Sequence, residues 1–131
     1  MDLDSVMDDA LRSWQGAVAI ACADVDAGFV LGASGRGEVE REVATTAAEC
    51  AAQMCTTPSF YSDVPPAVEE KDEALVVSSK WIHAYARVTR RPELVVVGVA
   101  RGDANVGLLL DWVKRVAGGL GDPEGRLEAA R

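Results

Sequence analysis

Histidine, cysteine and aromatic residues are scarce in this sequence of 131 residues. It has one histidine and three cysteines, and only 5% of its residues are aromatic. Few side chains can therefore change charge near neutral pH, which leaves little material for acid–base catalysis. An odd number of dispersed cysteines does not suit a disulfide scaffold. No apolar run approaches the roughly 20 residues that cross a bilayer. Since the first residues are acidic, unlike a secretory signal, we expect a cytoplasmic protein with no membrane insertion.

Basic residues are outnumbered as well. The chain has 13 Lys and Arg against 21 Asp and Glu, for a formal net charge of −8. Nucleic acid is therefore not expected as a partner, because phosphate backbones attract positively charged surfaces. The charge is also divided unevenly: residues 1–79 carry a net −11 and residues 80–131 a net +3. With 49% hydrophobic and 26% charged residues, the composition is typical of one globular domain.

Metal-binding spacings are missing from the sequence. Cys50 and Cys55 are five residues apart on a predicted helix, so their side chains point about 140° apart around its axis. They cannot both bind one ion without breaking that helix, and no C-x-x-C or H-x₃-H pair is present. We therefore expect no metal and no other cofactor.

Catalytic and phosphate-binding motifs are missing too. His83 would need Cys22, Ser78 or Ser79 as a nucleophile, and no G-x-S-x-G motif surrounds either serine. The glycine-rich segment 32–37, GASGRG, lacks the lysine and the spacing of a phosphate-binding loop. The sequence therefore predicts no catalytic residues and a protein that is not an enzyme.

The spacing of apolar residues predicts three helices and five strands, in the order α-β-β-α-β-β-β-α. Helices are expected over 2–15, over 38–56, and from Asp103 or Asn105 to about 120, with the last one interrupted at Gly118-Gly119. Strands are expected from Ala17, from Phe29 to a loop at 32–37, and over 73–79, 81–88 and 94–100. The first two strands form a hairpin, with its turn at Asp24–Gly28. We expect one domain over 1–120 and a disordered tail over 121–131.

Two elements have unusual apolar patterns. In the strand from Ala17, alternation places Val18, Ile20 and Cys22 on one face and four alanines on the other. A face made of alanine predicts a helix packed closely over it. The second helix carries two adjacent apolar stripes, so we expect it to pack against its own sheet and against a second copy of the chain.

This pattern resembles the roadblock/dynein-light-chain family, which includes bacterial gliding-motility polarity regulators. The resemblance covers about residues 2–120 and rests on the element order, the hairpin AVAIACADVDAGFVLGASG and the closing segment LVVVGVARGDANVGLLLDWVKRV. It implies an α+β fold: a single-layer, five-stranded antiparallel sheet with helices on both faces. The second helix would cover one face, and the first and last helices the other.

The resemblance also implies a non-enzymatic homodimer that binds and regulates a small Ras-like GTPase, or that scaffolds a signalling or motility complex. In such a dimer the edge strand over 73–79, which follows a long loop at 57–72, pairs with the same strand of the second copy, and the second helices pack together. Its segment LVVSS, residues 75–79, carries no charge, and an unprotected edge of that composition invites such pairing. The residues expected at this interface are Val43, Ala44, Ala47, Ala48, Ala51, Met54, Leu75, Val76 and Val77.

A second surface is predicted from the basic half of the chain. Tryptophan, tyrosine and arginine are the residue types that contribute most to protein interfaces, and a basic cluster would steer an acidic partner. The candidates are Trp81, Tyr85, Arg87, Arg90, Arg91 and Arg101. The alternative is an ordinary solvated surface with the two aromatic residues under a helix. An alternative function is a profilin-like domain that senses a small molecule, with residues 57–72 as a lid.

Overall fold

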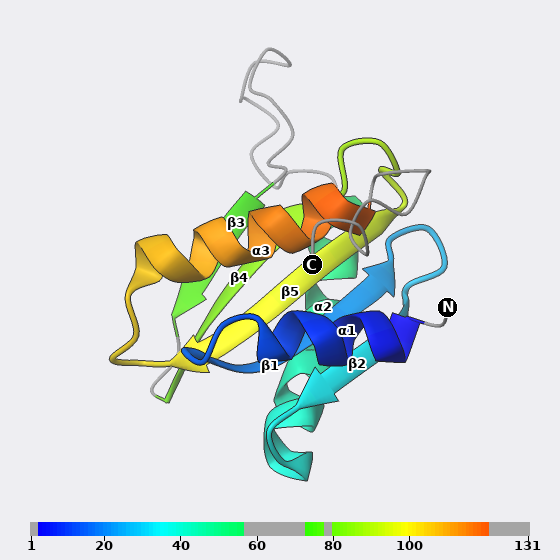
Figure 1. Cartoon of the computed structure of the whole chain (residues 1–131). Helices are drawn as coiled ribbons and strands as arrows, with labels where there is room; N and C mark the ends of the chain where they lie inside the picture. Colours follow the sequence, from blue (N-terminus) through cyan, green and yellow to red (C-terminus); the bar gives the residue numbers. More distant parts are fainter. Residues whose placement is uncertain (1–2, 57–72, 78–79, 121–131) are drawn as a thin grey trace.

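A computed structural model describes residues 3–56, 73–77 and 80–120. It contains one five-stranded antiparallel sheet in the order β2-β1-β5-β4-β3. Helices α1 and α3 cover one face of the sheet and α2 covers the other (Figure 1), which confirms the predicted fold. Along the chain the elements are α1 (Leu3–Arg12), β1 (Ala17–Asp24), β2 (Phe29–Gly35), α2 (Glu38–Thr56), β3 (Glu73–Val77), β4 (Trp81–Arg87), β5 (Leu94–Arg101) and α3 (Val106–Leu120). The predicted loop over 57–72 and tail over 121–131 lie outside the described residues.

Strand β5 is the centre of the sheet and is buried on both faces, as its valine-rich sequence predicts. Leu94 and Val96 pack under α1 and α3, whereas Val95, Val97 and Val99 pack under α2. Each face therefore has its own apolar core. The core beneath α1 and α3 contains the largest buried side chains, among them Trp112, Met7 and Leu109.

The core beneath α2 is built largely from alanine. Ala44 and Ala48 of α2 pack with Ala19, Ala21 and Ala23 of β1, and all five side chains are fully buried. Small side chains on both elements let the helix lie close to the sheet. The structure thus confirms the close packing expected from the alanine-rich face of β1.

The face assignment at the start of β1 is different from the predicted one. Val18 packs beneath α2 with Ala19, whereas Ala17 belongs to the opposite core with Ile20 and Cys22. The pairing between β1 and β5 is irregular between Ala17 and Ala19. Such a bulge breaks the two-residue alternation on which the sequence-based assignment depended, so Val18 and Ala17 exchange faces.

Strand β2 is longer than predicted, because residues 32–35 continue it instead of forming a loop. A Cβ atom added at Gly32 would lie 2.7 Å from Leu3 Cβ, so this glycine permits close packing with α1. Asp4 Oδ1 accepts a hydrogen bond from Ala33 N at 3.0 Å, and the Ser34 hydroxyl donates to Asp8 Oδ1. Glycine here serves helix packing rather than loop flexibility.

Arg36 joins the end of β2 to the segment between α1 and β1. Its Nε donates to Ala17 O at 2.7 Å, and its Nη2 donates to Leu11 O at 3.2 Å and to Trp14 O at 3.1 Å. Helix α1 ends at Arg12, before the predicted residue 15. The carbonyl groups at this helix end are therefore satisfied by a side chain from another element, a contact that sequence periodicity does not reveal.

Helix α3 is tied to α1 by a tryptophan. Trp112 Nε1 donates hydrogen bonds to Ala10 O at 3.2 Å and to Ser13 Oγ at 3.0 Å.

The ends of α3 and the β1–β2 turn can be compared with the sequence-based prediction. Asn105 Oδ1 caps α3 by accepting a hydrogen bond from Leu108 N at 3.0 Å, and Asn105 is one of the two residues at which the helix was predicted to begin. The helix continues to Leu120, so Gly118-Gly119 does not interrupt it. In the β1–β2 turn, which lies where the sequence predicted it, Gly28 has a φ of +77°, a conformation that glycine adopts readily.

Gly98 sets how closely α3 approaches β5. A Cβ atom added there would lie 2.5 Å from Val113 Cγ2 and 2.7 Å from Trp112 Cζ3, and both side chains are buried. We expect Gly98→Ala to lower the free energy of unfolding by about 1–3 kcal/mol through overpacking. The measurement is urea-induced unfolding followed by circular dichroism.

Gly118→Ala is the matched control. No atom lies within 4 Å of the added Cβ at this exposed position of α3. The same substitution should therefore raise stability by about 0.5–1 kcal/mol, because alanine is the better helix former. A Gly98→Ala variant as stable as the wild type would contradict the proposed contact.

Candidate interaction surface

An apolar groove lies between α2 and the strands β3 and β4, with a volume of about 510 Å³. Among the described elements, α2 packs mainly over β1, β2 and β5 and makes little contact with β4, so the groove forms beside the same face of β4 and β3. Most of the lining side chains are apolar. The lining residues are Val39, Glu42, Val43, Thr46, Ala47, Cys50, Ala51, Met54, Val76, His83, Tyr85 and Val97.

The two apolar stripes of α2 have different positions. One stripe, with Ala44 and Ala48, is completely buried against the sheet. The other borders the groove: Val43 and Ala47 are half-buried, and Met54 is 49% exposed. Ala44 and Ala48 therefore cannot contact a second chain, and this part of the predicted interface is wrong because the sheet already covers them. Ala51 is buried at the floor of the groove.

The three predicted interface residues of β3 are exposed, but they lie on two faces of the sheet. Val76 pairs with His83 and faces the groove. Leu75 and Val77 pair with Ala84 and Ile82, whose side chains belong to the core beneath α1 and α3. Only Val76 can therefore contact a molecule that fills the groove, whereas all three belong to an edge strand.

The two edges of the sheet are different. At the β2 edge, the backbone amide of Ala33 already donates a hydrogen bond to Asp4 of α1. The side-chain hydroxyl of Ser34 donates to Asp8 of the same helix. At the other edge, β3 pairs with β4 on one side, and no strand or helix of the described residues pairs with its other side. An unpaired strand edge offers its amides and carbonyls to another strand. Extension of the sheet is therefore possible at β3, beside the groove.

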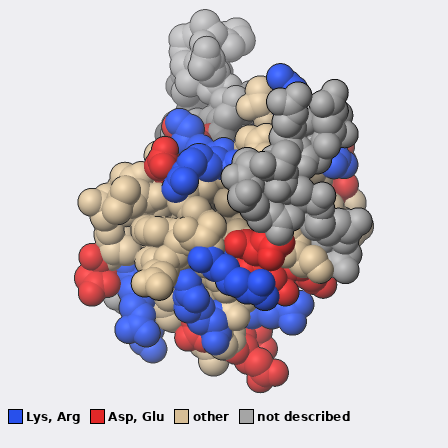
Figure 2. Space-filling model, in the orientation of Figure 1, with Lys and Arg blue, Asp and Glu red and all other residues tan. Residues whose placement is uncertain are grey.

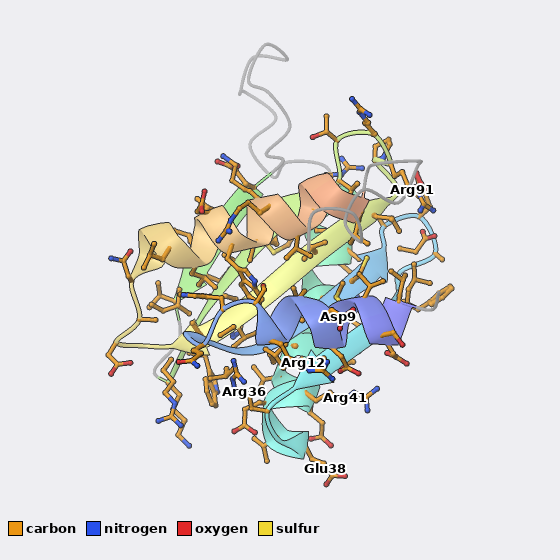
Figure 3. The ribbon with its side chains drawn as sticks, viewed as in Figure 1. Asp9, Arg12, Arg36, Glu38, Arg41 and Arg91 are labelled. Carbon is orange, nitrogen blue, oxygen red and sulfur yellow. The ribbon has the colours of Figure 1, made fainter. Side chains whose placement is uncertain are left out.

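The predicted basic surface is divided between the two ends of the sheet. Trp81 pairs with Arg101 at one end of the β4–β5 ladder, and Arg87 pairs with Val95 at the other. Six residues of extended strand separate them by roughly 20 Å. In Figure 3, Arg91 lies at the β4–β5 turn, well apart from the labelled arginines near α1 and α2. The six predicted residues therefore do not form one patch.

Two of these six residues are part of the core beneath α2. Tyr85 is only 6% exposed, and Trp81 is partly buried against the same cluster. This placement fits the alternative in which the two aromatic residues lie under a helix. At the β4–β5 turn, Arg87 Nη2 donates to Pro92 O at 2.5 Å and Arg91 Nε pairs with Glu93 at 3.2 Å. Arg90 and Arg91 are exposed there.

The opposite face of the molecule has a mixed charge pattern. In Figure 2, acidic and basic side chains surround an uncharged area over the N-terminal half of α3. Val106 and Leu108 of that helix are 37% and 54% exposed. The groove beside α2 combines exposed apolar side chains with a concave shape and is therefore the candidate interaction surface.

Few groups near the groove can titrate. His83 lines it, and burial lowers the pKa of its imidazole below the usual 6.5. Cys50 is exposed at the groove, whereas Cys22 is buried in the opposite core, where burial raises the pKa of its thiol to about 12. Within residues 3–56, 73–77 and 80–120, no group of three or more His, Cys, Asp or Glu side chains could hold a metal ion.

Among the described helices, none combines the length and the apolar character needed to cross a bilayer. The lid predicted for a small-molecule sensor, residues 57–72, lies outside the described residues and stays a prediction.

Comparison with known proteins reveals similarity at the level of structure. No protein-family model and no curated protein matches the sequence. A Roadblock/LC7 domain from Streptomyces avermitilis matches with a TM-score of 0.69 and 12% identity, over 100% of both chains. Myxococcus xanthus MglB matches with a TM-score of 0.64 and 16% identity, over 91% of this chain and 84% of that one. An MglB solved in a tetrameric arrangement matches with 0.61 and 20%, over 89% and 83%.

These matches define the class of fold. One open antiparallel sheet covered by helices on both faces is an α+β architecture shared along nearly the whole chain. More particularly, the chain has the fold of a roadblock domain, and the resemblance inferred from the sequence is confirmed at that level.

The positions of Cys50 and Cys22 lead to a test of the groove. In a Cys55→Ser background, we expect Ellman's reagent to modify one thiol rapidly and a second only after unfolding in urea. Cys50 is exposed at the groove, whereas Cys22 is buried and its raised pKa keeps it protonated. The rapid reaction should disappear in the double variant Cys50→Ser/Cys55→Ser. Rapid modification of two thiols in folded Cys55→Ser protein would contradict this arrangement.

Proposed function

We propose that this chain is a non-enzymatic, homodimeric interaction module that binds a small Ras-like GTPase or connects the components of a signalling or motility complex. The observation that carries the proposal is the continuity of an apolar groove with an open sheet edge, at Val76. Both features are surfaces for another polypeptide. The structural likeness to a Roadblock/LC7 domain and to an MglB solved in a tetrameric arrangement supports a role in assembly.

In the proposed dimer, β3 of each copy pairs with β3 of the other across a two-fold axis. This pairing uses the β3 edge, on the opposite side of the sheet from the β2 edge that α1 contacts. The exposed stripe of α2 then enters the groove of the partner, where Val39 and Met54, 63% and 49% exposed in the single chain, become covered. Backbone pairing sets the register and apolar burial supplies most of the free energy, at about 25 cal/mol per Å².

Sedimentation velocity tests the dimer. At micromolar concentration we expect a species of twice the chain mass. Val76→Lys should weaken self-association at least about tenfold, because a lysine charge would be buried in a largely apolar groove. Leu108→Lys is the matched control, since Leu108 is also apolar and is more exposed than Val76 (54% against 41%) but lies on α3, on the opposite face of the sheet. A wild-type monomer, or equal effects of the two substitutions, would contradict the proposed interface.

For the GTPase partner we propose contact at the β4–β5 turn, where Arg90 and Arg91 are exposed. Exposed arginines steer association with an acidic surface and are screened by salt. The probe is a small Ras-like GTPase encoded in the same genome, loaded with GDP or with a non-hydrolysable GTP analogue.

We expect binding that depends on the bound nucleotide and weakens about tenfold in Arg90→Glu/Arg91→Glu, measured by biolayer interferometry. Arg115→Glu, on α3, controls for charge reversal as such and should have little effect. Equal binding by both charge variants would refute the assigned contact. Failure of every GTPase to bind in either nucleotide state would refute the GTPase as partner.

A further inference from the structure

His83 is the single histidine of the chain and lies in the middle of β4. Its side chain lines the groove. Val76 of β3 and Val99 of β5 are its neighbours across the sheet, so it is flanked by aliphatic side chains on both sides. Tyr85 lies on the same face two residues along the strand. A titratable group is therefore set into the surface that, under the proposed function, a second copy covers.

The polar end of this imidazole is buried without compensation. Nε2 is inaccessible to solvent and has no hydrogen-bond partner among the residues that the structure describes. A neutral imidazole leaves one nitrogen as an acceptor there, whereas a protonated one would place a positive charge and a donor in apolar surroundings. Burial accordingly lowers the pKa of His83 even in the single chain.

The groups that face His83 in the groove are few. Helix α2 contributes Glu42 and Cys50, β4 contributes Tyr85, and β3 and β5 contribute valine side chains. Glu42 carries the one charge among the groove-lining residues of the described chain. Glu42 is itself exposed to solvent, and burial is the cause that lowers the pKa of His83.

We propose that His83 makes the covering of this groove dependent on pH, so that a second copy binds at neutral pH and is released under mildly acidic conditions. The proposal rests on the proposed self-association and adds its regulation. The partner's α2 would remove the remaining water around the imidazole, and protonation would then leave a charge buried in an apolar interface.

The direction of the pH dependence of association follows from linkage between proton binding and dimer formation. If covering the groove lowers the pKa of His83 further, the dimer binds fewer protons than two single chains. Association then weakens as the pH falls through the pKa of the single chain, and it does not change well above 6.5, the ordinary value. Each dimer contains two copies of His83, so up to two protons are linked to dissociation.

The dissociation constant of the dimer is measured between pH 5 and pH 8 by sedimentation equilibrium, for the wild type and for His83→Gln. The variant keeps a polar side chain but does not titrate, and it retains the overall acidic charge of the chain. The ratio of the two constants therefore isolates the imidazole from the general loss of negative charge. We expect this ratio to be constant above pH 7 and to rise at least about tenfold by pH 5.

A ratio that stays constant across the range would overturn the role of His83 while leaving the dimer itself intact. The absence of any dimer at pH 8 would overturn the proposed self-association and this inference together.

The wild type supplies a second measurement that does not depend on the folding of the His83→Gln variant. Its single imidazole resonance, followed by NMR, should titrate at a lower pH in concentrated than in dilute protein. Equal midpoints, or a higher one in concentrated protein, would also overturn the proposal.

Discussion

The close packing of α2 on the sheet, alanine against alanine, is the constraint on which the rest of the molecule depends. Ala44 and Ala48 can rest on Ala19 and Ala21 because none of these side chains extends beyond Cβ. This contact fixes the rotation of α2 about its axis, and the second apolar stripe of the helix is consequently left beside the uncovered part of β4. The groove is therefore a product of core packing: a larger residue at these positions would lift the helix and change the surface as well as the core.

The opposite layer explains why the two edges of the described sheet differ. Helix α1 approaches β2 closely at Gly32, and Asp4 occupies the amide of Ala33 that another strand would need. Arg36 and Trp112 hold the end of α1 in place by hydrogen bonds to its carbonyl groups and to the segment that follows. The β3 edge has no comparable protection in the described chain. Because this edge adjoins the groove, backbone pairing and apolar burial would act on the same partner in the proposed dimer.

Much of the fold could be predicted because its signals are local. Helix α2 has the predicted bounds, and the valine run of β5 is buried on both faces as expected. The errors arose where packing between distant elements overrides a local pattern. The bulge near Val18 depends on pairing with β5, and the extension of β2 through Gly32 depends on α1. The residues of the predicted basic surface do not form one patch for a related reason. Arg87 and Arg101 are each the last residue of a strand, and antiparallel pairing of β4 with β5 places them at opposite ends of the sheet.

By itself, then, the sequence determined the order of the elements, their types, the alanine-rich face of β1 and the two apolar stripes of α2, since each of these is a pattern of neighbours along the chain. Only the tertiary structure decided which stripe of α2 faces the sheet, which edge stays open, and that Val76 and His83 share a groove. Those outcomes depend on contacts between residues far apart in the sequence. The physical reason is that periodicity records which side of an element is apolar, whereas only three-dimensional packing determines whether that side is already covered.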